Sequence, residues 1–354
     1  MKAFPCADAK PPDRPARRFF ARLGLAVIAS LLTVCGVELV LRSFFPLYTA
    51  GGVVGLYQYD AELGDRLRPG IHFTRTTDYQ EEIHTNQLGT VNFQESFEPY
   101  ERIVFAAGDS YTQGTGLPTD ASYPFQLDLL LNMQDGAYQQ TYGVVNLGLS
   151  AYGLEQTLIC LRRYAGILGR PDYILFLGCD NDYVDDVEFR EGDRHRHLTE
   201  GNPHWGPWLK PVQWLTVESE IGKRLKVAIR KTQRRRRLDA SKASMSEHPM
   251  PCRAALVEPA LARLLEAASE LGATLVVSWA ALPDDPSPSY QWFKEWARSH
   301  NVAFADWHGR VQSACEAIEG LPMLNPHSGG HYRTWVNTMI AASFAEQIRA
   351  SESP

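Results

Sequence analysis

Residues 102–116 read RIVFAAGDSYTQGTG, and this stretch decides the fold. The run Ile103–Ala107 is continuously apolar, which is typical of a strand buried on both faces of a parallel sheet. It stops abruptly at Gly108-Asp109-Ser110, where a helix should begin. In open α/β sheets, ligands bind at the carboxyl ends of the strands. We therefore expect Ser110 at the rim of a sheet, with its hydroxyl held outside the core.

A serine in this position is suited to nucleophilic chemistry. Its backbone N–H points to the same side as the unpaired amides of the helix that follows. Such amides can stabilise an oxyanion while the hydroxyl forms a covalent intermediate. The triplet is also compatible with an ordinary helix N-cap, so the assignment depends on the other loops of the chain.

A regular alternation of strands and helices surrounds this stretch. It predicts an α/β fold with a doubly wound, parallel five-stranded sheet flanked by helices in three layers. The predicted strands are 103–107, 144–147, 173–177, 274–278 and 302–305. The predicted helices begin near Ser122 and cover 154–168, 254–271, 290–300 and 333–349.

The amino terminus has the form of a membrane anchor. A basic tail, 1–18, precedes an apolar segment, 19–42, which as a helix is roughly 34 Å long and could cross a bilayer. The basic flank predicts that the tail stays in the cytoplasm and that the rest of the chain is exported. A cleaved signal peptide is the alternative, although no small-x-small site follows Leu32. Cys35 resembles a lipoprotein cysteine, but Val34 before it fits that poorly.

The remaining chain divides into a lead-in segment, 43–100, and a domain, 101–354, with an insertion at 183–250. We expect the lead-in, which is rich in turn signals and polar residues, to be an irregular segment lying on the domain. Within the insertion, 223–237 contains nine Lys and Arg residues and no acidic residue. We interpret this run as a solvated helix face, with binding of anionic glycan or lipid headgroups as the alternative. The whole chain has a net charge of −6 although this run and the amino-terminal tail are basic, so the rest of the chain is acidic. An acidic main body argues against nucleic acid as a partner.

The cysteines and glycines predict neither a metal nor an organic cofactor. The cysteines form no CxxC pair, so a zinc site is not expected. In an oxidising compartment four of them could form up to two disulfides in three possible pairings, or remain buried free thiols: Cys160, Cys179, Cys252 and Cys315. The first strand lacks the GxGxxG spacing of a dinucleotide-binding fold.

Three further loops fall at the same edge of the predicted sheet. The second strand ends in Asn146-Leu147-Gly148, where Gly148 offers a backbone N–H. The third ends in the segment 178–182, where Asn181 offers a side-chain amide. Near the carboxyl end, His331 precedes the last helix and offers an imidazole base. Taken singly, these residues are equally compatible with a turn glycine, an Asx turn and a surface histidine.

Together and in this order, the segments resemble the four sequence blocks of the SGNH (GDSL-type) hydrolase superfamily of esterases, lipases and acyl-group enzymes. The resemblance implies a flavodoxin-like three-layer fold, with Ser110 as nucleophile and His331 as base. It also implies an oxyanion hole formed by the amides of Ser110 and Gly148 and by the Asn181 side chain. One departure is Cys179, which occupies the usual glycine position of the third block.

The last block departs further from the superfamily. Its usual form, Asp-x-x-His or Asp-x-His, places an acid beside the base, but Ser328 and Gly329 hold those positions here. We consider Asp306, at the end of the fifth strand, the candidate substitute that orients His331 in the catalytic group. A backbone carbonyl is the alternative, and His327 is a rival for the base.

The resemblance extends outside the four blocks. Segments 38–42, 62–70 and 85–89 resemble the membrane-anchored bacterial branch, which implies a single-pass protein of the inner membrane with a periplasmic catalytic domain. The implied activity is that of a serine-dependent acyl or acetyl esterase acting on acylated envelope carbohydrate or lipid. The alternatives are an O-acyltransferase of envelope polysaccharide and a non-catalytic glycan- or partner-binding protein with a degraded triad.

Overall fold

The computed structural model describes most of the chain outside the insertion. The described residues are 14–44, 56–76, 80–134, 136–190, 219–222, 224–225, 252–281, 288–325 and 330–352. Two compact units are present, one formed by Met1–Thr49 with Trp205–Ser244 and the other by Ala50–His204 with Met245–Pro354. Most of the predicted insertion, with its tryptophans and its basic run, lies outside the described residues.

The first unit contains helix α1 (Arg14–Phe44). Within its stretch Arg18–Phe44, an 18-residue window has a mean hydropathy of 2.3, and none of that window is buried. This helix is long and apolar enough to cross a membrane, as predicted for the anchor, and a secretory signal sequence has the same properties. Near its end, the Glu38 carboxylate accepts hydrogen bonds from the Ser219 hydroxyl at 3.0 Å and the Glu220 N–H at 2.8 Å. Through these bonds, Glu38, the one acidic side chain of the apolar stretch, has polar partners.

The second unit is built on a five-stranded sheet with the order β11-β10-β9-β5-β8, in which all neighbouring pairs are parallel. Its strands are β5 (Arg102–Gly108), β8 (Tyr142–Asn146), β9 (Tyr173–Cys179), β10 (Thr274–Ala280) and β11 (Ala303–Phe304). The predicted α/β fold class and the predicted strands are confirmed.

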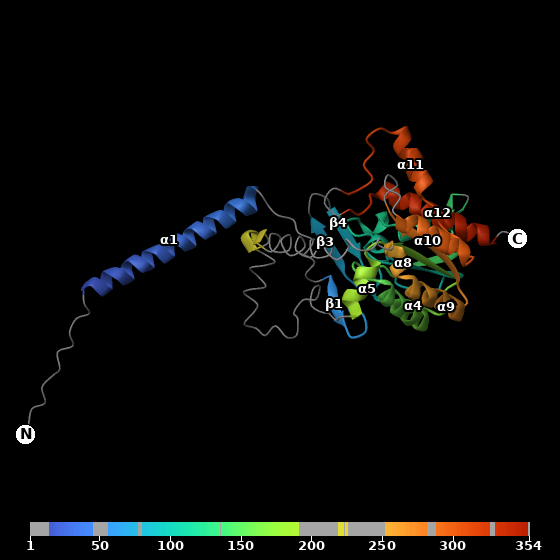
Figure 1. Ribbon diagram of the computed structural model, residues 1–354, viewed down its shortest axis with the longest axis horizontal. Coiled ribbons are helices and arrows are strands. Elements are labelled where there is room, and N and C mark those ends of the chain that lie inside the picture. The colour runs from blue at the N-terminus through green and yellow to red at the C-terminus, as the bar shows by residue number, and fades with distance from the viewer. Residues whose placement is uncertain are drawn as a thin grey trace, which may run out of the picture. The chain divides into compact units, whose positions relative to one another are not determined.

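Helices cover both faces of this sheet, and the side chains of β5 alternate between the two cores. Phe105 and Ala107 pack with α4 and α9, whereas Val104 and Ala106 pack with α3 and α12. Figure 1 shows α4 and α9 on one side of the sheet, and α11 and α12 on the other. The longer helices are α3 (Tyr123–Asn132), α4 (Leu154–Leu168), α5 (Asp182–Arg190), α9 (Glu258–Leu271), α10 (Pro288–Ser299), α11 (His308–Ala317) and α12 (Thr334–Glu352). Short helical turns are α2 (Ser110–Gln113), η1 (Thr119–Ala121) and α8 (Arg253–Leu256).

The lead-in segment is more regular than its sequence indicated. It forms two antiparallel hairpins, and a third small one follows α3. Leu56, Leu67 and Ile83 are buried in the same core as α4 and α9, so this segment completes one layer of the fold. The hairpin strands are β1 (Tyr57–Asp60), β2 (Gly64–Leu67), β3 (His72–Thr76), β4 (Gln80–His84), β6 (Met133–Gln134) and β7 (Ala137–Tyr138).

The four described cysteines of this unit form no disulfide, in agreement with one of the two alternatives left open by the sequence. Cys160 and Cys179 are buried, and Cys252 and Cys315 are partly exposed.

Asp128 on α3 is a buried carboxyl that should make stability depend on pH. It is 2% exposed, and its Oδ2 accepts a 2.6 Å bond from the Tyr138 hydroxyl. Burial raises the pKa of Asp128 to about 6, although the Tyr138 bond opposes the shift. Because the folded pKa lies above the unfolded one, the contribution is fully present below the unfolded pKa and is lost as the pH rises through about 6.

We expect Asp128→Asn to remove this pH dependence. Between about pH 4 and pH 7.5, the wild-type free energy of unfolding should fall relative to that of the variant by up to roughly 3 kcal/mol, since one pKa unit corresponds to about 1.4 kcal/mol. Urea unfolding of the detergent-solubilised chain at several pH values measures this difference. A constant difference between the two proteins across the range would contradict the burial argument.

Candidate active site

The candidate nucleophile lies at the carboxyl end of β5, at the first residue of α2. Gly108 has φ +149°, and a Cβ there would lie 2.6 Å from the Leu177 carbonyl oxygen, so only glycine fits. Asp109 caps α2 by accepting a 2.9 Å bond from the Tyr111 N–H. Ser110 therefore leaves the sheet at a tight strand-to-helix turn, as its sequence context predicts.

The structure brings together Ser110 and His331, which lie 221 positions apart. His331 Nε2 is 2.7 Å from Ser110 Oγ. Ser110 Oγ is also 3.2 Å from the Asp109 carboxylate. A hydroxyl with an imidazole nitrogen in hydrogen-bond range has the geometry of a nucleophile next to its general base.

The His331 ring is held by aromatic packing. Its centroid is 5.0 Å from that of Tyr111, which in turn is 4.9 Å from the Tyr332 ring. The Tyr111 hydroxyl donates a 3.4 Å bond to the Gly330 carbonyl. Burial raises the pKa of Tyr111, so the phenol remains a donor at neutral pH. Sequence reasoning missed Tyr111, although its place directly after Ser110 puts it at this rim.

Hydrogen bonds also join the His331 segment to the loop after α2. The Asn325 N–H donates to the His331 carbonyl at 2.8 Å, and the Asn325 side chain donates to the Gly116 carbonyl at 2.8 Å. Residues 326–329 lie outside the described residues. They include His327, the rival base, and the two positions at which the superfamily carries its acid.

The structure does not bring Asp306 to His331. The Asp306 carboxylate accepts bonds from the Tyr290 hydroxyl and Lys294, both at 2.6 Å, and from the His308 N–H at 3.2 Å. The bonds from Lys294 and Tyr290 outweigh burial and lower the pKa of Asp306. Its position at the end of β11 is as expected, but its side chain is used to join α10 to the start of α11. The predicted role of Asp306 in orienting the base therefore has no support in this arrangement.

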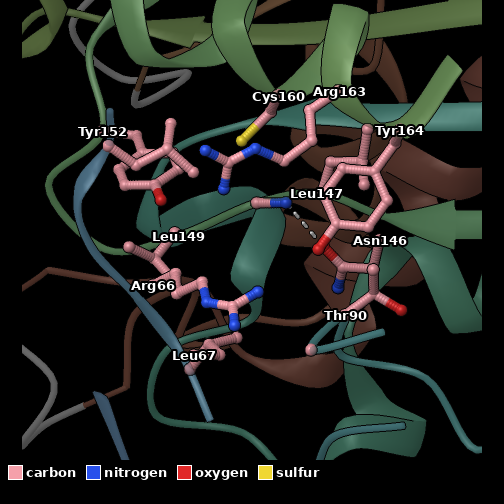
Figure 2. A pocket seen from close by; sticks show the side chains of 13 residues that line it. Arg66, Leu67, Thr90, Asn146, Leu147, Leu149, Tyr152, Cys160, Arg163 and Tyr164 are labelled. Carbon is pink, nitrogen blue, oxygen red and sulfur yellow. Dashed lines mark hydrogen bonds between the residues drawn. The ribbon is translucent and has the colours of Figure 1, made fainter. Parts of the chain in front are cut away.

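Gly148 lies against the turn that carries Ser110. An added Cβ would lie 2.3 Å from Gln113 N and 2.6 Å from the carbonyl carbon of Thr112. The Gly148 N–H donates to the Asn146 side-chain oxygen at 3.0 Å. Figure 2 shows this bond beside a small cavity that is lined by the same loop and by Tyr164. The predicted oxyanion donor is thus near α2, but it has an internal acceptor.

Asn181 has a similar arrangement of internal partners. Its Nδ2 donates to Asp109 at 3.3 Å and to Asp185 at 2.7 Å. Since Ser110 Oγ touches the same Asp109 oxygen, the amide lies at the corner occupied by the nucleophile. Both predicted donors are therefore grouped around α2, with bonds to protein oxygens.

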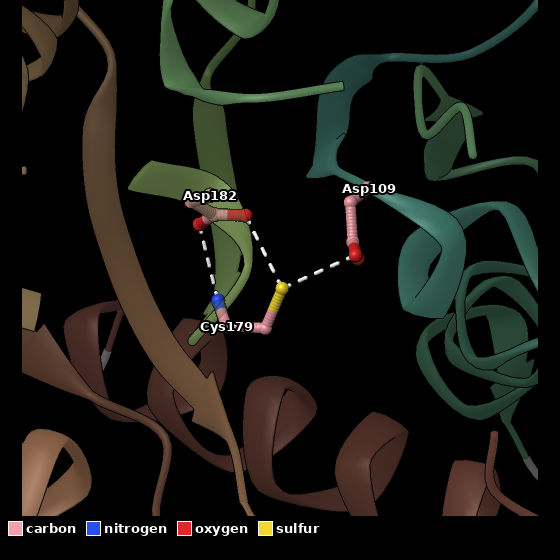
Figure 3. A group of neighbouring side chains, drawn as sticks. All are labelled: Asp109, Cys179 and Asp182. Atoms are coloured by element: carbon pink, nitrogen blue, oxygen red, sulfur yellow. Dashed lines mark hydrogen bonds between the residues drawn. The ribbon is translucent and has the colours of Figure 1, made fainter. Parts of the chain in front are cut away.

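A buried cluster of one thiol and two carboxyls supports this corner. Cys179 Sγ lies 3.1 Å from Asp109 Oδ2 and 3.2 Å from Asp182 Oδ1, and the Cys179 N–H donates to Asp182 Oδ2 (Figure 3). These side chains are the one group among the described residues whose metal-ligand atoms lie within 4.8 Å of one another. Their contacts are those of a hydrogen-bonded cluster, and we describe them as such.

Gly148→Ala tests the close packing of this loop. Because the added Cβ would meet backbone atoms on α2, we expect the free energy of unfolding to fall by about 1–3 kcal/mol. Gly166→Ala is the matched control, since it lies within α4 and no atom is within 4 Å of its added Cβ. That change should raise the free energy of unfolding by about 0.5–1 kcal/mol. Chemical denaturation of both variants measures the two effects, and a neutral Gly148→Ala would contradict the packing.

Comparison with known proteins gives matches only among solved structures. No protein-family model matches the chain, and neither does any curated protein. A member of the lipolytic G-D-S-L family from Veillonella parvula is 12% identical, with a TM-score of 0.40, over 70% of this chain and 97% of its own. A catalytic mutant of an acetylxylan esterase from Geobacillus stearothermophilus is 14% identical, with a TM-score of 0.39, over 70% of this chain and 94% of its own.

An alpha/beta hydrolase from the metagenome of Lake Arreo is 13% identical, with a TM-score of 0.41, over 73% of this chain and 99% of its own. Several of the solved structures similar to this chain are thus GDSL-type or SGNH proteins, the superfamily that the sequence motifs resemble.

Proposed function

We propose that this chain is a serine-dependent ester hydrolase of the SGNH type, acting outside the cytoplasmic membrane on acylated carbohydrate or lipid of the cell envelope. The observation that carries the proposal is the 2.7 Å contact between Ser110 Oγ and His331 Nε2. A hydroxyl of ordinary acidity is a weak nucleophile, and an adjacent imidazole activates it by accepting its proton.

The reaction begins when Ser110 Oγ attacks the ester carbonyl and its proton moves to His331 Nε2. The carbonyl oxygen becomes an oxyanion, which the Ser110 and Gly148 amides and the Asn181 side chain stabilise. The imidazolium then gives the proton to the departing alcohol, leaving an acyl group on Ser110. Water, deprotonated by His331, releases the acid and restores the hydroxyl.

The internal partners of the donors set a condition on this mechanism. In the structure, the Gly148 N–H bonds to Asn146, and the Asn181 amide bonds to Asp109 and Asp185. An oxyanion at Ser110 must therefore displace, or share hydrogens with, these oxygens. This requirement favours transition-state binding over ground-state binding, because a neutral ester oxygen competes poorly with a carboxylate for the Asn181 amide.

The second part of the proposal is the substrate, an acylated carbohydrate or lipid of the cell envelope. It is supported by α1, which is long and apolar enough to cross a membrane, and by the basic residues that precede its apolar stretch. An enzyme tethered to the outer face of the membrane would meet acylated polymers and lipids there.

The test is hydrolysis of p-nitrophenyl acetate, and labelling by a fluorophosphonate, with the full chain in detergent. We expect labelling and turnover by the wild type, and a fall in kcat of at least about 10³-fold in Ser110→Ala. Ser299→Ala is the control, because that hydroxyl lies on α10 and bonds to the Trp296 carbonyl and the neighbouring His300. It should retain wild-type turnover.

Two results would overturn the proposal. One is equal turnover by Ser110→Ala and the wild type. The other is a folded wild type that neither hydrolyses the ester nor reacts with the fluorophosphonate, which would favour a non-catalytic binding protein on the same fold.

A further inference from the structure

The third loop of the site carries a thiol where the superfamily block usually has glycine. Cys179 is the last residue of β9, and its side chain is buried. Its Sγ lies 2.8 Å from Asn181 Oδ1, in addition to the two carboxylate oxygens at 3.1 and 3.2 Å. A glycine would leave this space without a hydrogen-bonding group, so the substitution adds contacts to the site.

The number of hydrogens in the cluster determines which group donates each hydrogen bond and which accepts it. The thiol has one hydrogen but three oxygen neighbours, from Asn181, Asp109 and Asp182. Burial, reinforced by the charge of Asp109, raises the pKa of Cys179 well above its ordinary value, so the sulfur keeps its hydrogen. Asp109 and Asp182 are 0% and 2% exposed, and two carboxylates so close cannot both ionise without a cost.

Burial favours the protonated form of Asp182. Burial and the charge of Asp109 raise its pKa well above the ordinary value. A protonated Asp182 Oδ1 can donate to Sγ, since their separation is 3.2 Å. The thiol hydrogen is then available to the oxygen of Asn181, its nearest neighbour at 2.8 Å.

We propose that Cys179 is a positioning residue, whose S–H holds the Asn181 oxygen and thereby keeps the Asn181 amide directed at the corner of Asp109 and Ser110. The inference rests on the proposed function, because it is the oxyanion role of Asn181 that gives the orientation a consequence. An amide fixed only through its nitrogen can turn when an oxyanion replaces one of its carboxylate partners. An amide fixed at both ends keeps its place.

The consequence for the reaction is a rate effect. Small displacements of a catalytic group can cost up to about 10²-fold in rate, while removal of one oxyanion donor costs about 10²–10³-fold in kcat. Loss of the thiol should therefore lower kcat less than loss of the amide does. It should leave KM almost unchanged, because Asn181 acts on the developing charge and not on the bound ester.

The experiment is a double-mutant cycle on p-nitrophenyl acetate hydrolysis by the full chain, with Cys179→Ala, Asn181→Ala and the double variant. We expect Cys179→Ala to lower kcat roughly 10- to 100-fold and Asn181→Ala about 10²–10³-fold. If the thiol acts through the amide, Cys179→Ala added to Asn181→Ala should cost less than about twofold.

Cys179→Ser separates this role from simple space filling. The serine hydroxyl donates a hydrogen bond as the thiol does, so we expect kcat within about threefold of the wild type. If Cys179→Ala fails to fold, Cys179→Gly, the residue of the superfamily block, serves in the same cycle, with thermal unfolding as the check of folding.

The outcomes distinguish this inference from the function on which it rests. An active wild type with an equally active, folded Cys179→Ala overturns the positioning role alone. So does a double variant in which the two losses multiply, because Cys179 would then act independently of Asn181. A wild type without esterase activity overturns the proposed function and this inference with it.

Discussion

The parallel register of β8, β5 and β9 is the constraint on which the site depends. Ala106 of β5 is paired with Asn146 of β8, and Gly108 of β5 with Leu177 of β9. Each strand ends within two or so residues of these pairs, so the three following loops must emerge at one rim. Ser110, Gly148 and Asn181 meet there because hydrogen bonds between the strands bring the ends of the strands to the same level.

The electrostatics of this rim explain why its donors have protein acceptors. A polar group buried without a partner costs about 1–3 kcal/mol, and the Gly148 N–H and the Asn181 amide are provided with Asn146, Asp109 and Asp185. An oxyanion that forms at Ser110 would have to displace these oxygens or share their hydrogens, and it would compete with carboxylates at Asn181 but with a neutral amide oxygen at Gly148.

The sequence was sufficient for the parts of the structure that follow from local patterns. Continuous apolar runs identified every strand of the central sheet. The order of the loops along the chain was enough to predict that Ser110 and His331 lie at the same edge of that sheet. The hairpins of the lead-in were missed because β1 and β2, YQYD and GDRL, lack a continuous apolar run. For Asp306, the position at a strand end is visible in the sequence, but the bonds to Tyr290 and Lys294 are not, because they depend on how α10 packs.

The contacts of His331 indicate how the proposed base can be oriented although the sequence has no acid at the usual position. Tyr111 follows Ser110 in the single turn of α2, and its ring packs on the imidazole while its hydroxyl reaches the Gly330 carbonyl. The turn that carries Ser110 thereby also restrains the segment that carries His331. Ring packing fixes orientation but supplies no charge. A negative group does lie beside Ser110, since the Asp109 carboxylate is 3.2 Å from Ser110 Oγ.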